Sequence, residues 1–307
     1  MKNIVMKQAM MNKVLYALVP SIILSVFLFG WRSLVVILFT NAIAFLTEYL
    51  FIRKKPNGKV SMAVFVTGTL LAMTLPPTIP LWIAGVGAVI AVAFGKMVFG
   101  GFGMNVFNPA IVGRTFIYVS FPQQMTINWI QPFTKLPGGF VNYVNSIDMQ
   151  TSATILTSSK LGETTNYTLW NAFSGIIPGS LGETSALLIL LGAIYLIFTK
   201  TAKWQPMVAT IASLYLFNVI FYGFGDALYF LVSGGAMFGI VYMVTDPVSQ
   251  AKTKPGLWIY GIMIGFLTVF IRRYSLFSEG FMFAILIANT FMPIVEFYLK
   301  PKKQGAK

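Results

Sequence analysis

The chain has 307 residues, of which 57% are hydrophobic and only 10% are charged, and its mean hydropathy is +0.77. Soluble globular proteins carry about 25% charged residues, so this composition excludes that class and predicts an all-α, multi-pass membrane protein. The net charge of +14 is explained by Lys and Arg in short loops on one side of a membrane, so we expect a lipid bilayer and no nucleic acid as partner.

The predicted helices follow from the apolar runs, because roughly 20 such residues cross the hydrocarbon core of a bilayer. We expect about ten transmembrane helices. Lys2, Lys7 and Lys13 precede the first, which we interpret as an anchor because Trp31-Arg32 stands where a cleaved signal peptide would have small residues. The ten expected spans are residues 14–30, 33–52, 61–75, 80–99, 106–121, 184–199, 205–222, 227–245, 256–271 and 279–300.

The spans divide the chain into four expected parts. Residues 1–121 form a first five-helix half, and residues 184–300 form a second. Between them lies a polar loop, residues 122–183, and loops of this length are usually functional or disordered. Residues 301–307 form a basic tail.

The distribution of Lys and Arg predicts the orientation of the chain. With both termini in the cytoplasm, all but six of the 22 Lys and Arg residues lie on the inner side, and these inner residues include Lys96. Of the six others, Arg114 lies within a span and five lie on the outer side. This asymmetry places the loop of residues 122–183 outside the cytoplasm. The five expected on the outer side are Arg32, Lys135, Lys160, Arg272 and Arg273.

Two short internal sequence similarities favour two inverted five-helix repeats. The pattern Asn-x-Phe-x-Pro occurs at residues 105–109 and again at 289–293, on the fifth and tenth spans. Residues 65–68 (FVTG) are similar to residues 231–234 (LVSG), on the third and eighth spans. Because each half has an odd number of helices, the second repeat would have the opposite orientation in the membrane. Chance also accounts for sequence similarities this short.

The absence of cysteine and histidine limits the redox chemistry that this chain can hold. Iron–sulfur clusters and haem are held mostly by Cys or His, and structural zinc by both, so we expect no metal site. An electron carrier on this chain would therefore be organic.

Four motifs resemble those of a known family. They are TLPPTIPLW at residues 74–82, GGFGMNVFNPA at 100–110, PGSLGE at 178–183 and TDPVS at 245–249. In this order they are similar to the NqrB/RnfD family, membrane subunits of the sodium-pumping NADH:quinone reductase and of the Rnf complex. The resemblance extends from about Asn57 to Glu296. The short amino-terminal region is more similar to RnfD, which we favour, whereas residues 74–82 and Gly113-Arg114 are more similar to NqrB.

The same resemblance implies a covalent flavin. Members of the family attach FMN through a phosphoester to the last Thr of the pattern D-x-x-[ST]-[GS]-A-T, which Asp148, Thr151, Ser152, Ala153 and Thr154 match. Thr154 is thus the expected FMN anchor of a flavoprotein and phosphoprotein, modified outside the cytoplasm by a flavin transferase. Ser152 replaces a common Gly. The residues alone would indicate only an ordinary loop or helix cap. The resemblance also implies a second, non-covalent flavin, riboflavin or FMN, within the bundle.

Charged residues in or beside the apolar spans are candidates for an ion pathway. Asp246, before Pro247, is either a helix N-cap or a cation or proton site. Glu183 is either a first-turn acid that favours the helix dipole or a pathway residue. Glu48 lies inside an apolar span, and Arg114 is expected to pair with an acid or to contact a flavin.

A further acid, Glu296, lies inside the tenth span, where it is either a functional group or a side chain that reaches the interface.

By resemblance, the chain passes electrons through flavin within an Rnf-type ferredoxin:NAD oxidoreductase that translocates Na⁺ or H⁺ across a bacterial or archaeal cytoplasmic membrane. Its partners would be the other membrane and peripheral subunits, since one chain without nucleotide or cluster motifs holds no complete active site. Three alternatives remain open: an NqrB-type subunit, a flavinylated anchor that does not pump, and a non-redox channel or secondary transporter, which would use a similar bundle.

Overall fold

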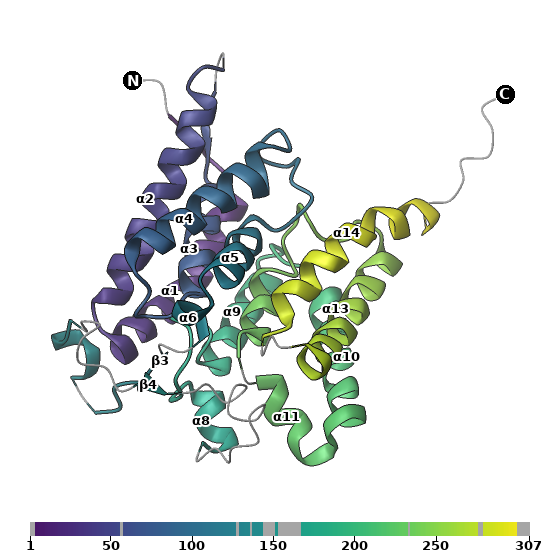
Figure 1. Cartoon of the computed structure of the whole chain (residues 1–307). Coiled ribbons are helices and arrows are strands. Elements are labelled where there is room, and N and C mark those ends of the chain that lie inside the picture. Colours follow the sequence, from purple (N-terminus) through teal and green to yellow (C-terminus); the bar gives the residue numbers. More distant parts are fainter. Residues whose placement is uncertain are drawn as a thin grey trace.

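The computed structural model describes residues 4–55, 58–126, 129–135, 137–143, 151–152, 167–232, 234–275 and 279–299, and the described part is mostly helical (Figure 1). The strands are only two residues long. They form a parallel pair, β1 with β2, and an antiparallel pair, β3 with β4. The first half contains β1 (Val5–Met6), α1 (Ala9–Phe29), α2 (Arg32–Ile52), β2 (Val60–Ser61), α3 (Ala63–Met73), α4 (Leu81–Val92), the π-helix η1 (Ala93–Met97) and α5 (Pro109–Ser120). The middle contains α6 (Pro122–Thr126), β3 (Trp129–Ile130), the 3₁₀-helix η2 (Gly138–Val141), β4 (Thr151–Ser152) and α8 (Leu169–Ser174). The second half contains α9 (Ala186–Phe198), α10 (Trp204–Tyr222), α11 (Phe224–Val232), α12 (Ala236–Tyr242), α13 (Lys254–Tyr274) and α14 (Phe281–Leu299).

Five helices, α1, α2, α10, α13 and α14, are long and apolar enough to cross a membrane. They agree closely with the spans expected from the apolar runs. Shorter apolar helices stand at four other expected spans: α3, α4 continued by η1, α5 and α9. The class of helical membrane protein is therefore confirmed.

The expected eighth span, residues 227–245, is wrong as one continuous helix. The chain forms α11, turns at Gly234 with φ of 69°, and then forms the seven-residue helix α12. A positive φ costs little for glycine, which allows the chain to leave the helix there. The expected third span is also short, because α3 has 11 residues and rises only about 16 Å.

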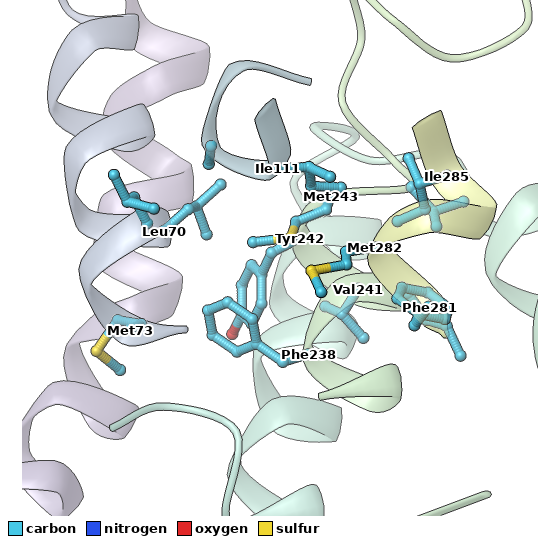
Figure 2. Close-up of a cluster of buried hydrophobic side chains, with 14 of the residues drawn as sticks. Leu70, Met73, Ile111, Phe238, Val241, Tyr242, Met243, Phe281, Met282 and Ile285 are labelled. Atoms are coloured by element: carbon cyan, nitrogen blue, oxygen red, sulfur yellow. The ribbon is translucent and has the colours of Figure 1, made fainter. Parts of the chain in front are cut away.

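The two short helices α3 and α12 lie in the centre of the bundle. Figure 1 shows α1 to α4 on one side and α10, α13 and α14 on the other, with α5 and α9 between them. Leu70 and Met73 of α3 face Phe238 and Tyr242 of α12 across the core in Figure 2, and Ile111 of α5 closes one side. All are buried. The core therefore joins the two halves.

Close packing in the second half depends on glycine. A Cβ on Gly261 of α13 would lie 2.5 Å from Cβ of Ala209 in α10, and one on Gly265 would lie 2.7 Å from the amide nitrogen of Leu214. In a membrane the hydrophobic effect does not drive helices together, so association depends on close packing, which small residues allow. These two glycines thus set the spacing of α10 and α13.

The described middle segment lies at one end of the bundle, where α1 ends. The amide of Phe133 donates to the carbonyl of Leu28 at 2.9 Å, and Trp31 Nε1 donates to the carbonyl of Phe140 at 2.7 Å. Figure 1 shows β3, β4, α8 and α11 at this end, and the carboxyl-terminal end of α14 toward the other.

The two members of each pair of similar segments adopt different local structures. Asn108 and Pro109 of the first Asn-x-Phe-x-Pro segment begin α5, whereas Pro293 of the second lies inside α14. In the other pair, Gly68 is inside α3, but Gly234 forms the turn before α12. The equivalence of these segments stays a prediction.

Candidate functional site

A large pocket lies at the end of the bundle where α1 begins. It encloses about 690 Å³ of empty space, including the part open to solvent. Its walls combine apolar side chains from the first turns of α1 and α3 with a polar group of side chains. That polar group consists of Thr67, Lys96, Asn105, Asn108, Thr201, Tyr242, Thr245 and Asp246.

Two of the four family motifs meet in this pocket. Residues 100–110 contribute Phe102, Asn105 and Asn108, and residues 245–249 contribute Thr245 and Asp246. These segments lie more than a hundred positions apart in the sequence. The fold therefore converts two separate motifs into one site.

Asn108 joins these two segments. Its side-chain oxygen accepts hydrogen bonds from the amides of Ala110 at 3.0 Å and Ile111 at 3.4 Å, which caps α5. Its Nδ2 donates to the carbonyl of Met243, just after α12, at 3.3 Å. Pro109 occupies the first turn of α5, where a missing N–H costs nothing. One amide side chain thus holds the start of α5 against the end of α12.

Asp246 lies at the pocket wall in a single turn and does not begin a helix, so the N-cap interpretation is wrong as stated. Its Oδ2 accepts from the amide of Ser249 at 3.1 Å and from Oγ of the same residue at 2.7 Å. Lys252 Nζ donates to the carbonyls of Pro247 at 2.6 Å and Val248 at 2.7 Å. Partial burial lowers the pKa of Lys252, and the nearby Asp246 carboxylate opposes that shift.

A buried ion pair holds Lys96, which lines the pocket. Lys96 Nζ lies 2.6 Å from Oε2 of Glu48 and 2.5 Å from Oγ of Ser61. The other oxygen of Glu48 accepts from the amide of Ser61 at 2.9 Å. Lys96 is only 2% exposed and Glu48 only 3%. Lys96 is therefore a buried charge and not an exposed loop cation, and its expected place on the inner side stays a prediction.

The π-helix explains this position of Lys96. The amide of Val98 donates to the carbonyl of Ala93, and the amide of Gly101 donates to that of Lys96 at 3.2 Å. This wider turn brings Gly95 against Pro109, where an added Cβ would lie 2.7 Å from the Pro109 Cα. Such π-turns inside α-helices are frequent at functional sites.

A second cluster of buried charges lies toward the other end of the bundle. Arg114 of α5 forms ion pairs with Glu183 and Glu279, and its Nη2 lies 3.2 Å from Oε2 of Glu183. The first-turn interpretation of Glu183 is wrong, because α9 begins at Ala186 and Ser185 caps it. Arg114 is thus paired with acids, and its expected contact with a flavin stays a prediction.

A small pocket beside this cluster encloses about 340 Å³ of empty space and is bordered by Arg114, Arg272 and Glu279. Arg272 is buried and its Nη1 donates to the carbonyl of Phe230 at 2.9 Å. Arg272 is therefore a buried cation at the end of α13, and its expected place on the outer side stays a prediction.

The remaining two motifs also meet each other. The amides of Leu181 and Gly182 donate to the carbonyls of Leu75 at 3.1 Å and Met73 at 2.8 Å. Arg32 donates to the carbonyls of Pro77 at 3.0 Å and Ile79 at 3.1 Å. Residues 74–82 and 178–183 therefore form one connected unit at the end of α3.

Glu296 is buried near the end of α14 and does not extend to the surface. Its Oε1 accepts from the amides of Lys252 and Thr253, each at 2.9 Å, and from Oγ1 of Thr253 at 2.9 Å. This carboxylate therefore fixes the start of α13 against α14.

The expected covalent flavin site falls mostly outside the described residues. Asp148, Ala153 and Thr154 are not among them. Ser152 is described through its backbone, which pairs with Trp129 across β3 and β4. The assignment of FMN to Thr154 stays a prediction.

Sequence reasoning missed Lys96, Ser61, Glu279 and the pocket asparagines. A signal for Lys96 was present, because it is a lone cation in the fourth apolar run, as Arg114 is in the fifth. No comparable signal marked Glu279, whose partner lies 165 positions away.

The chain is similar to membrane subunits of two kinds of ion-translocating oxidoreductase. The D-type subunit of the ion-translocating oxidoreductase complex of Actinobacillus succinogenes is 34% identical over 95% of this chain and 92% of its own length. The D-type subunit of the proton-translocating ferredoxin:NAD(+) oxidoreductase complex of Clostridium ljungdahlii is 36% identical over 97% of this chain and 91% of its own. The B-type subunit of the Na(+)-translocating NADH-quinone reductase of Chromohalobacter salexigens is 38% identical over 85% of this chain, but the match spans only 64% of that protein.

The model of one family matches residues 2–305, nearly the whole chain. The match includes every helix described above and both pairs of motifs that meet in space. This chain therefore belongs to the NQR2, RnfD, RnfE family.

Proposed function

We propose that this protein is the D-type, flavin-carrying membrane subunit of an Rnf-type ion-translocating oxidoreductase. The observation that carries the proposal is the length of the matches. The D-type relatives align over 91–92% of their own length and at least 95% of this chain, whereas the B-type relative aligns over 64% of its length. An NqrB-type subunit is the second candidate, favoured by its 38% identity.

The proposed cellular setting is the cytoplasmic membrane of a bacterium or archaeon. Ten membrane passages in two inverted halves, with both termini inside, remain part of the proposal. Lys13 Nζ donates to the carbonyl of Thr199, and Lys252 lies beside Asp246, so cations gather at the end that holds the large pocket. The positive-inside rule then supports a cytoplasmic position for this pocket and an outer position for residues 122–183.

The proposed role is to pass electrons between other subunits of the complex while Na⁺ or H⁺ is translocated. Thr154 would hold FMN through a phosphoester, attached by a flavin transferase. FMN would supply one- or two-electron transfer there. Asp148, Ser152 and Ala153 complete the attachment pattern, and small neighbours leave the threonine hydroxyl accessible to the transferase.

The large pocket is the proposed site of the second, non-covalent flavin. Its lining is mostly apolar with a few polar groups, as is usual for cofactor pockets. Asn105 keeps one amide N–H and its side-chain oxygen, and the Thr245 hydroxyl oxygen can accept, which suits the carbonyl and ring nitrogens of a flavin. Phe102 and Tyr242 offer aromatic surface.

Asp246 borders the same space and is the acid that we propose for an ion path near the flavin. Glu48 and Glu183 are the other proposed members of that path, and each has a cationic partner.

In-gel fluorescence after denaturation tests the covalent flavin. The chain is expressed with the flavin transferase as wild type, as Thr154→Ala and as the matched loop control Thr157→Ala. We expect fluorescent wild-type and control bands, a dark Thr154→Ala band, and an FMN-sized mass on the peptide that contains Thr154. A dark wild-type band would exclude the covalent flavin and leave a non-redox transporter as the better interpretation.

A further inference from the structure

The ammonium group of Lys96, the cation that lines the large pocket, has a third N–H donor beyond the two that Glu48 and Ser61 accept. An ammonium group has three N–H donors, and two of those of Lys96 are taken by Glu48 and Ser61. Lys96 also borders the pocket, where its Nζ lies 5.9 Å from the ring centre of Phe102. The third donor is therefore placed to serve an occupant of the pocket.

Lys96 is also the only Lys or Arg among the residues that line this pocket, all of which the structure describes. The one acid in the lining, Asp246, directs Oδ2 to the amide and hydroxyl of Ser249. The field inside the pocket is thus set by Lys96, by the Glu48 carboxylate directly behind it and by the Asp246 carboxylate at the wall.

Glu48 fixes the direction of the Lys96 side chain. One of its oxygens binds Lys96, and the other accepts from the backbone amide of Ser61, so the carboxylate cannot follow the ammonium into the pocket. Ser61 belongs to β2, which pairs with β1, and this ties the group to the backbone. Glu48 and Ser61 therefore position Lys96.

We propose that Lys96 compensates the negative charge that the occupant of the pocket gains on reduction, and that the Glu48 carboxylate limits this compensation. The inference rests on the proposed function, since the occupant is the non-covalent flavin. An electron arrives from another flavin or redox centre of the complex and adds one negative charge to the pocket. No bond of the chain forms or breaks, and the proton stays on Nζ of Lys96.

The physical reason is the weak screening of charges in a buried site. A charge within a few ångströms of an ammonium interacts several times more strongly there than in water. A fixed cation thus favours the reduced form, and a fixed carboxylate beside it disfavours that form. Removing one or the other must shift the reduction potential in opposite directions.

The experiment uses the whole complex, expressed with its flavin transferase, and measures the reduction potential of the non-covalent flavin by spectroscopic titration. Lys96→Gln is expected to weaken the reduced form about tenfold, which lowers a one-electron potential by about 59 mV. Glu48→Gln is expected to raise the potential. The double variant should lie between the two single variants, and Lys96→Arg should stay near the wild type because it keeps the charge.

The covalent flavin on Thr154 is the internal control, because its fluorescence reports assembly and its potential should stay constant in every variant. If Lys96→Gln does not assemble, Glu48→Gln decides alone by the sign of its shift. An unchanged potential in Lys96→Gln, or a lowered one in Glu48→Gln, would overturn the role of Lys96 while the proposed flavin protein stands. A wild-type complex that releases no flavin on acid extraction would instead overturn the assignment of the pocket and remove the basis of this inference.

Discussion

Two groups of buried ion pairs in the described part of this protein connect different parts of the fold. Lys96 pairs with Glu48, 48 positions away, and both belong to the first half of the chain. Arg114 also belongs to the first half, but its partners Glu183 and Glu279 lie 69 and 165 positions away. The first pair borders the large pocket, and the second borders the small one.

The difference indicates two roles for buried charge. The pair of Lys96 and Glu48 can persist when the two halves move relative to each other, which suits a constant charge beside a cofactor. The cluster around Arg114 holds the segments before α9 and α14 against α5, so it resists separation of the halves. Breaking a buried pair costs much more than the pair contributes, because it leaves a charge without its partner.

The largest expected effect comes from breaking the cluster between the halves. Arg114→Leu would leave Glu183 and Glu279 buried together without their ion-pair partner, and we expect a loss of about 3–5 kcal/mol in stability. Thermal melting of the detergent-solubilised protein, followed by size-exclusion chromatography, measures it. Arg273→Leu is the matched control, since Arg273 is exposed on the last turn of α13. Equal melting of the two variants would contradict the role of the cluster.

A smaller effect is expected from removing one acid of the same cluster. Glu279→Gln leaves Arg114 paired with Glu183, so only one charged hydrogen bond is weakened, and we expect a loss of about 1.5–3 kcal/mol. The same melting experiment measures it, and the shift should be clearly smaller than that of Arg114→Leu. A loss as large as that of Arg114→Leu would show that Glu279 is the main partner of Arg114.

The smallest effect is expected at the edge of the first pair. Phe102→Leu removes the aromatic ring that lies 5.9 Å from Lys96 Nζ but keeps the ion pair, so we expect a loss of about 0.5–1 kcal/mol. Melting of this variant against the wild type tests this value, with the exposed Met104→Leu as control. A loss like that of Arg114→Leu would mean that Phe102 supports the fold of the pocket and not only the cation.

The sequence alone determined the class, the family and the long helices of this protein. Its composition excluded a soluble domain, and four motifs in order predicted the family that the whole-chain match confirms. Residues 33–52 were expected as one span and form α2 at Arg32–Ile52. These features follow from local properties, because a run of about 20 apolar residues has few alternatives to a membrane helix.

Only the tertiary structure decided which residues meet. Lys96 was expected on the inner side of the membrane, but only the fold shows that a π-turn, with Gly95 packed against Pro109, directs it to Glu48. Glu183 resembled an acid in a first helical turn, yet its partner is Arg114. Buried charges find their partners through the packing of whole helices, because an unpaired charge in the core costs far more than any local preference supplies.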